Sequence, residues 1–444
     1  MVMSSARTAF IVAVSRGSEK GPSPTPATRM PLGAASIAAS LTAGGVSTRL
    51  VDMALSPGWS IEELAALLRT APAVGISYMS DCAPDVLKAV EIARAEGYGG
   101  PIVLGGPGAT SSADEIVAGW PGVDCVVLGE GESVALDVFS SLIDKKSLSG
   151  MPGIRARGMQ RSSSRVRIRD LDALYAEPRY DRFLASYGDV VPIETTRGCP
   201  YGCTFCDASA LWSGRQVRRS LESVLRDVAH YVELGYRRFH FLDDTLTASP
   251  SYVLHLCEGL SELQVTWHCS VRAEHLRPAL IDSLAEAGCV SVFVGIESGA
   301  EAIRAAIGKP IDLQAVEHDI AYASGRLSVT ASLMWGFPFE TLSQFRQTLR
   351  LSRSLRESRG AKVSLYRLMP LPGSPLFADY RDSLQPRAER AWPGRLPGLV
   401  GARGVKVLMQ RYPKVFAAYF NYTTPRLSKK LELLEESGVA SDFF

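Results

Sequence analysis

The first third of the chain alternates short apolar runs with longer amphipathic segments. The apolar runs, which predict buried strands, lie at 10–14, 48–51, 74–77, 102–104 and 125–128. Segments of helical length lie at 32–43, 61–69, 85–95, 114–118 and 133–142. This alternation is typical of a parallel sheet covered by helices. Residues 1–145 are therefore predicted to form a doubly wound, Rossmann-like α/β domain.

A second alternation follows a polar stretch at 145–170 that is rich in Arg and Ser. Gly150, Pro152 and Gly153 break any regular element there, so residues 146–185 are predicted to be a linker with room for a small hairpin. Further strands are expected at 190–195, 238–242, 265–270, 291–295, 328–334 and 362–368, with helices around 221–234, 251–263, 279–287, 313–324 and 343–354. Six β/α units predict a partial TIM-like (β/α)6 barrel over 186–376, with its chemistry at the carboxyl ends of the strands.

The β/α pattern breaks after Pro370, and a patch rich in Pro and Gly follows at 386–404. The tail beyond it has a helical pattern and carries five aromatic rings: Tyr412, Phe416, Tyr419, Phe420 and Tyr422. Residues 377–444 are predicted to form a small helical region. We expect its rings to form a packed core, and a cap over a substrate is the alternative.

The composition narrows the class of protein. A hydrophobic fraction of 46% in 444 residues excludes wholesale disorder. A formal charge of +2 gives no electrostatic reason to expect nucleic acid or an anionic membrane as the main partner. No apolar run approaches the roughly 20 residues of a membrane span, and the run at 8–14 lacks a clear cleavage site of a signal peptide. Eight Cys in so long a chain do not suggest a disulfide scaffold, which favours a cytoplasmic location.

The distribution of His and Cys is more informative. Every His lies at or beyond His230, so the first half of the chain cannot supply an imidazole to a metal. Cys199, Cys203 and Cys206 lie together on a segment that follows the first strand of the second unit. Three thiolates can converge on one soft metal centre there. Structural zinc normally requires four protein ligands, whereas three leave one iron of a [4Fe–4S] cluster open to a small molecule.

The cysteine segment resembles the signature of the radical S-adenosylmethionine (SAM) superfamily, Cys-x3-Cys-x2-Cys with an aromatic residue, here Phe205, before the last Cys. The resemblance implies that the three cysteines hold a [4Fe–4S] cluster and that SAM chelates the fourth iron. It also implies SAM contacts from Phe205 and from residues at the ends of the next three strands: Asp243, Asp244, Ser270, Arg272, Gly295, Glu297 and Ser298. For Arg272, a surface arginine at a helix start is the alternative.

The N-terminal domain has glycine-rich turns after its predicted strands, but no Gly-x-Gly-x-x-Gly opens its first helix, so a dinucleotide is not expected. The turns resemble the cobalamin-binding domain of class B radical SAM enzymes. The segments 336–338 and 370–375, at the ends of two barrel strands, resemble the radical SAM subgroup that carries such a domain. That resemblance implies cobalamin contacts from Ser77, Tyr78, Gly105, Gly106, Gly108, Gly129 and Glu130. Any cobalamin must be bound without an axial His from this domain, and Gly108 stands where His is frequent.

By resemblance, the chain is expected to be a cobalamin-dependent radical SAM C-methyltransferase acting on a small natural-product or amino-acid-derived molecule. An electron donor such as flavodoxin or ferredoxin is the expected partner. The alternatives are a radical SAM enzyme that rearranges, cyclises or couples its substrate, and an iron–sulfur protein without enzymatic activity. His240 and His268 are expected to face the barrel, where they can contact substrate or pack as core residues. Cys82 and Tyr78 lie near the expected corrin face, with ordinary packing as the alternative.

Overall fold

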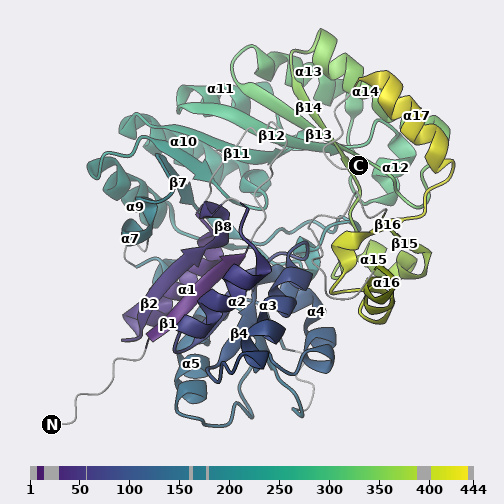
Figure 1. Cartoon of the computed structure of the whole chain (residues 1–444). Helices are drawn as coiled ribbons and strands as arrows, with labels where there is room; N and C mark the ends of the chain where they lie inside the picture. The colour runs from purple at the N-terminus through teal and green to yellow at the C-terminus, as the bar shows by residue number, and fades with distance from the viewer. Residues whose placement is uncertain are drawn as a thin grey trace.

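The computed structural model describes residues 8–14, 30–56, 58–159, 164–176, 180–387 and 402–438. Two α/β units follow one another along the chain, and the C-terminal segment contacts both (Figure 1). Most of the patch predicted at 386–404 lies outside the described residues.

The N-terminal unit is a six-stranded sheet with helices on both faces. Its strand order is β2-β1-β3-β4-β5-β6, and only β6 runs antiparallel to its neighbour. The strands are β1 Thr8–Val14, β2 Ser47–Asp52, β3 Val74–Tyr78, β4 Ile102–Gly105, β5 Cys125–Val127 and β6 Ile154–Arg155. One face packs on α1 Leu32–Ala43 and α5 Ala135–Ile143, and the other on α2 Ile61–Thr70, α3 Ala83–Ala95 and α4 Gly106–Gly119. The predicted doubly wound domain is confirmed.

Two details of this unit differ from the prediction. Helix α4 begins at Gly106, well before the predicted start at 114, because a helix accepts Pro107 in its first turn and packing outweighs the low helical propensity of glycine. Strand β6 comes from the predicted linker and extends the sheet beyond β5 instead of forming a hairpin of its own. The N-terminal unit therefore extends past residue 145.

The second unit is an open barrel of six parallel strands in the order β14-β13-β12-β11-β10-β7. The strands are β7 Val190–Ile193, β10 Arg238–Phe241, β11 Thr266–Arg272, β12 Cys289–Glu297, β13 Ser328–Trp335 and β14 Lys362–Arg367. The helices outside them are α9 Leu221–Glu233, α10 Pro250–Leu263, α11 Pro278–Glu286, α13 Leu313–Ser324 and α14 Leu342–Ser358. Since β7 and β14 are the two edges, the barrel does not close, and the predicted partial barrel is confirmed.

Several short elements were not predicted. A helix of fewer than two turns, or a strand with only two paired residues, leaves little periodic signal in the sequence. These short elements are a hairpin of β8 Thr196–Arg197 and β9 Val217–Arg218, the helices α6 Leu171–Leu174, α7 Asp181–Leu184, α8 Ala208–Leu211, α12 Glu301–Ala306 and α15 Pro375–Tyr380, and 3-10 turns at Met53–Leu55, Gly131–Ser133, Leu246–Ala248, Ala273–His275, Arg381–Ser383 and Ala417–Tyr419. The hairpin matters most, since it carries the cysteine segment between its two strands.

The C-terminal segment connects the two units. Helix α16 Ala402–Arg411 leads to Phe416 and Tyr419, which are buried in the core that α2, α3 and α4 form on their face of the N-terminal sheet. The chain then forms β16 Phe420–Tyr422, antiparallel to β15 Leu384–Pro386, and ends in α17 Leu427–Ser437 against α14. The rings thus pack in a core, as predicted, although the strand pair was not expected.

None of the helices in the described part of the chain combines the length and apolarity that crossing a bilayer requires.

Candidate functional site

The cysteine loop, residues 198–207, follows β8 at the carboxyl end of β7. Cys203 is buried, while Cys199 and Cys206 are partly exposed. The pKa of Cys206 is raised to about 11, mainly by burial and also by the neighbouring Cys203 and Cys199 thiols. Thiols in this setting need a strong positive centre to become thiolates, which iron provides.

The donor set of the loop fits a cluster better than a single ion. The three cysteines interact electrostatically with one another. A [4Fe–4S] cluster accepts each thiolate on a different iron, so three protein thiolates leave the fourth iron open, whereas structural zinc normally requires four protein ligands. Cys199, Cys203 and Cys206 therefore suit a cluster.

Asp243 fixes the strand that leads into the cysteine loop. Its Oδ1 accepts hydrogen bonds from Thr195 N (3.1 Å), Thr195 Oγ1 (2.8 Å), Thr196 Oγ1 (2.7 Å) and Thr196 N. The other oxygen, Oδ2, is buried without a hydrogen-bond partner in the described structure. Asp243 thus positions β8 through one oxygen, and a contact of the other oxygen with SAM stays a prediction. Its neighbour Asp244 is exposed and stays a predicted SAM contact.

Arg272 lies beside the cluster site. Its side chain is buried, and its guanidinium lies 3.6 Å from the centre of the Tyr201 ring and 3.8 Å, through Nη1, from Cys203 Sγ. Nε donates to Glu274 at 2.6 Å. The surface interpretation of Arg272 is therefore wrong, and its pairing with the SAM carboxylate stays a prediction.

Sequence reasoning missed the side chains around Arg272. Tyr201 Oη hydrogen-bonds His275 Nε2 at 3.0 Å, and His275 Nδ1 bonds Thr247 Oγ1 at the same distance. These residues follow three different strands, so only the barrel brings them together. In the sequence His275 is a lone histidine after the strand β11, so no pattern indicated that it contributes to the site.

The end of β12 is held by contacts within the protein. Glu297 is buried and forms an ion pair with Lys309 at 2.7 Å, and a side chain at Gly295 would meet the charged ends of both. Ser298 is fully buried; its hydroxyl bonds Thr348 Oγ1 at 3.0 Å and accepts from Ala300 N. The SAM contacts of Gly295, Glu297 and Ser298 stay predictions.

The other two predicted SAM contacts occupy distinct surroundings. Ser270 is partly exposed at the carboxyl end of β11, where its register partner on β12 is Phe293. The Phe205 ring packs edge-on against Phe337, which belongs to the segment 336–338, with ring centres 6.4 Å apart. Both positions agree with a site at the carboxyl ends of the strands.

Most of the predicted cobalamin residues are explained without a ligand. A side chain at Gly106 would strike Ser77, and one at Gly108 would strike the backbone of the turn after β3. Tyr78 is 2% exposed and lies in the core with Cys82. Both side chains thus pack in the core, which is the alternative given for them, and a contact of Tyr78 with cobalamin stays a prediction. A side chain at Gly105 would meet no atom, so the end of β4 stays open to a ligand.

Gly129 and Glu130 hold the linker. A side chain at Gly129 would collide with the Val166 carbonyl, and the two residues form a parallel bridge. Glu130 Oε2 accepts from Ile168 N at 2.8 Å. These contacts explain both residues without a ligand, and their cobalamin contacts stay predictions.

A buried ion cluster joins the N-terminal unit to the cysteine loop. The Arg197 guanidinium pairs with Glu130 at 3.1 Å, Glu132 at 2.8 Å and Glu194 at 2.8 Å. Burial raises the pKa of Glu130. At Glu132 burial acts in the same direction, but the Arg197 charge and the hydrogen bonds to the carboxylate together outweigh it and lower the pKa. Because Arg197 lies two residues before Cys199, it ties the edge of the N-terminal sheet to the candidate cluster.

The inner face of the barrel is polar. The side chains opposite the core-facing residues, in order of strand, are His240, His268, Ser270, Ser291, Phe293, Thr330, Ser332, Ser364 and Tyr366. The His240 and His268 rings lie 4.4 Å apart on neighbouring strands. The hydroxyls of Ser270, Thr330, Ser332 and Ser364 have no hydrogen-bond partner among the described residues. These groups can bind a polar molecule.

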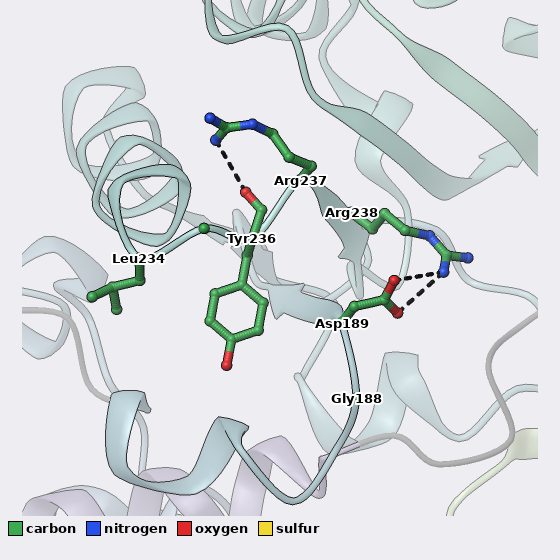
Figure 2. Close-up of a pocket in the computed structure, with 7 residues that line it drawn as sticks. Gly188, Asp189, Leu234, Tyr236, Arg237 and Arg238 are labelled. Atoms are coloured by element: carbon green, nitrogen blue, oxygen red, sulfur yellow. Dashed lines mark hydrogen bonds and ion pairs between the residues drawn. The ribbon is translucent and has the colours of Figure 1, made fainter.

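A depression of about 270 Å³ lies at the opposite end of the barrel. Figure 2 shows its lining residues, Gly188, Asp189, Leu234, Gly235, Tyr236, Arg237 and Arg238. They precede β7 and β10, whereas the cysteine loop follows the carboxyl end of β7. Asp189 pairs with Arg238 at 2.9 Å, and Arg237 donates to backbone carbonyls. The depression is therefore separate from the candidate site.

Comparison with known proteins identifies both units. The model of the radical SAM superfamily matches residues 193–352, and that of the B12 binding domain matches residues 27–139. Residues 193–352 therefore form a radical SAM domain, and a B12 binding domain precedes it. These two domains imply a [4Fe–4S] cluster, SAM and cobalamin as cofactors.

Two curated relatives are methyltransferases by name. An uncharacterized methyltransferase of Pyrococcus horikoshii is 29% identical over 297 residues, which are 64% of this chain and 64% of the relative. The bacteriochlorophyllide d C-12(1)-methyltransferase of Chlorobaculum tepidum is 25% identical over 304 residues, 66% of this chain and 62% of the relative. The chain thus spans less than two thirds of the length of these relatives.

Two solved structures share the whole fold. The radical SAM methyltransferase TsrM from Kitasatospora setae, with tryptophan and a SAM analogue bound, superposes with a TM-score of 0.71 over 97% of this chain and 88% of its own, at 16% identity. The cobalamin-dependent radical SAM enzyme OxsB with aqua-cobalamin gives 0.73 over 97% of this chain and 66% of its own, at 15% identity. At such identities these likenesses concern the fold.

Proposed function

We propose that the protein is a cobalamin-dependent radical SAM C-methyltransferase acting on a small molecule. The observation that carries the proposal is the Arg197 cluster, which holds the B12 binding domain against the strand that precedes Cys199. A methyl donor on one domain and a radical source on the other must face the same substrate, so their relative position has to be fixed. The methyltransferase names of the relatives support the same reaction.

The cofactors supply the chemistry, namely a 5′-deoxyadenosyl radical from SAM and the cluster, and a methyl group from methylcobalamin. The chain supplies geometry and exclusion of water. Cys199, Cys203 and Cys206 hold the cluster, and Asp243 fixes the strand that carries them. Arg272 places a positive charge at Cys203, which suits an anionic cluster and the carboxylate of SAM.

The substrate of the proposed reaction is a small polar molecule, such as an amino-acid-derived or other natural-product intermediate. The hydroxyls of Ser270, Thr330, Ser332 and Ser364 line the barrel, and burying them against an apolar polycycle would leave them unsatisfied. The His240 and His268 pair adds two polar rings at the amino-terminal part of the same face. This face favours a substrate rich in hydrogen-bonding groups.

A second candidate comes from other relatives. Two anaerobic magnesium-protoporphyrin IX monomethyl ester cyclases, from Rubrivivax gelatinosus and Cereibacter sphaeroides, are 22% and 24% identical over about two thirds of this chain. The same domains could therefore serve ring formation, rearrangement or coupling, without transfer of a methyl group.

The two candidates differ in the mass of the product. We would supply the anaerobically reconstituted protein with SAM carrying a trideuterated methyl group, cobalamin, a reductant and fractionated metabolites. Methyl transfer predicts a product that gains the labelled methyl group together with 5′-deoxyadenosine. A product without the label, formed with 5′-deoxyadenosine, would contradict the methyltransferase and support the second candidate.

A further inference from the structure

An extended segment of the linker presents a row of arginines. Between Ser164 and Asp170 the sequence alternates Arg165, Arg167 and Arg169 with Val166 and Ile168. Val166 is buried and pairs with Gly129, and Ile168 N bonds the buried Glu130. Since alternate residues of an extended chain point to opposite sides, the three arginines face away from the N-terminal sheet.

A second basic segment lies against this row. Arg167 donates to Ser213 Oγ at 2.9 Å and lies over the Trp212 ring, and Arg165 donates to the Ala210 carbonyl. Arg215 and Arg218 follow in the same segment and are exposed. Together, Arg165, Arg167, Arg169, Arg215 and Arg218 form what we call the arginine patch.

The charges of the patch are close enough to affect one another. The pKa of Arg167 is lowered by burial and by the Arg165 and Arg215 charges, and the Glu130 carboxylate opposes this shift. Glu130 itself pairs with Arg197, whereas Asp170 and Asp172 accept backbone hydrogen bonds and keep their negative charges. The five arginines outnumber these three carboxylates. The patch is therefore a local concentration of positive charge in a chain whose net charge is only +2.

The patch adjoins the cysteine loop. A side chain at Gly198, next to Cys199, would collide with the Arg215 carbonyl, and the Gln216 amide donates to the Gly198 carbonyl at 3.2 Å. Helix α8 starts two residues after Cys206 and leads directly into the second basic segment. A molecule bound to the patch therefore rests on the outer side of the loop that holds the cluster ligands.

We propose that the arginine patch is the docking surface for an acidic one-electron carrier protein that reduces the cluster. The inference rests on the proposed radical SAM reaction, which consumes one electron for each reductive cleavage of SAM. With a flavodoxin as carrier, the anionic flavin hydroquinone loses one electron and becomes the neutral semiquinone, and the oxidised cluster gains that electron. No proton or other reactant is needed. Complementary charge speeds the encounter and makes it sensitive to salt.

The test uses the full chain with its cluster and a purified acidic flavodoxin. The variant Arg169→Glu/Arg215→Glu changes two exposed side chains that form no hydrogen bond, ion pair or ring contact among the described residues. Arg346→Glu/Arg350→Glu makes the same charge change on the exposed face of α14 and serves as the matched control. Binding of flavodoxin is measured by calorimetry at low and high salt, and cluster reduction by stopped-flow absorbance without substrate.

We expect the patch variant to bind flavodoxin at least about tenfold more weakly, with a flatter salt dependence, while the control behaves as wild type. Reduction by dithionite, which needs no docking surface, should be unchanged in both variants. Arg169→Gln/Arg215→Gln should give an intermediate affinity, which separates a charge effect from a folding defect.

Three results would overturn the proposal: equal affinities of the patch variant and wild type, equal losses in the patch and control variants, or no salt-dependent binding of wild type to flavodoxin. Tighter, competing binding of a single-stranded oligonucleotide would assign the patch to nucleic acid instead. Because binding and reduction are measured without substrate, a protein that docks flavodoxin but makes no methylated product would contradict only the proposed function.

Discussion

At the scale of the residue, buried charges decide how the site is held. Asp243, Arg197 and the Glu297–Lys309 pair are all nearly excluded from water. A buried charge is tolerated only when it is paired or hydrogen-bonded, so each of these groups fixes its neighbours. The cysteine loop depends on two of them directly, since Asp243 bonds the two residues that precede Arg197.

Asp243 predicts a pH dependence. Burial raises its pKa from 3.8 to about 6, and the hydrogen bonds from Thr196 and Thr195 oppose this rise. Between pH 3.8 and about 6 the folded state therefore binds more protons than the unfolded state. The contribution of Asp243 to the free energy of unfolding is present below pH 4 and is lost as the pH rises through 6. The loss amounts to up to about 3 kcal/mol.

Asp243→Asn removes this titration and keeps an oxygen for Thr195 and Thr196. We therefore expect its midpoint of thermal unfolding to fall less than that of wild type between pH 4 and pH 7. Identical pH profiles of variant and wild type would show that Asp243 is ionised throughout this range.

The assignment of the three cysteines as cluster ligands predicts that substituting one of them removes the iron, whereas substituting another cysteine does not. Cys203→Ala should lose the iron and sulfide of the anaerobically reconstituted protein and its SAM cleavage, because a cluster with two protein ligands is not retained. Cys257→Ala, a buried cysteine on α10, serves as the control and should keep both. Equal iron contents in the two variants would contradict the assignment.

The residues of the site divide by the kind of signal that they leave in the sequence. The three cysteines are close in sequence, so their spacing predicts their convergence. Lys309 and Tyr201 become meaningful only when the fold brings them to Glu297 and Arg272. Glycines leave an ambiguous signal for a related reason: a close approach to a ligand and one to the protein's own backbone require the same residue, as at Gly108.

At the scale of the element, the long strands and helices were predictable, whereas the short ones that complete the site were not. Buried strands such as β13 and amphipathic helices such as α14 show a clear pattern of hydrophobic and polar residues in the sequence. The hairpin β8–β9 consists of two residues on each side, and its position is set by contacts with other segments. Arg197 supplies the most important of them.

The ion pairs of Arg197 predict that substitutions of Arg197 and of Glu132 do not affect stability independently. Arg197→Gln leaves Glu130, Glu132 and Glu194 without their counter-charge, and removing one partner of a buried pair typically costs about 3–5 kcal/mol. We expect a lower midpoint of thermal unfolding, partly restored by Glu132→Gln in the same chain. Additive losses in the double variant would show that the two side chains do not interact energetically.

At the scale of the whole molecule, the C-terminal segment belongs to the N-terminal core as much as to the barrel. Phe416 is 3% exposed and packs with residues of the N-terminal unit, although more than 250 residues separate them. Phe416→Ala should lower the free energy of unfolding by about 3–5 kcal/mol. Val407→Ala on the exposed side of α16 should change it little. Equal effects of the two substitutions on denaturant unfolding would contradict this packing.

The central claim is that one chain holds a cluster and a cobalamin on two domains that face a common substrate. The most direct test is to quantify iron, sulfide and corrinoid in the full chain, purified without oxygen after expression with cobalamin. The account predicts about four irons and one corrinoid per chain, with the iron alone lost in Cys203→Ala. A full complement of iron and sulfide without any corrinoid would contradict it.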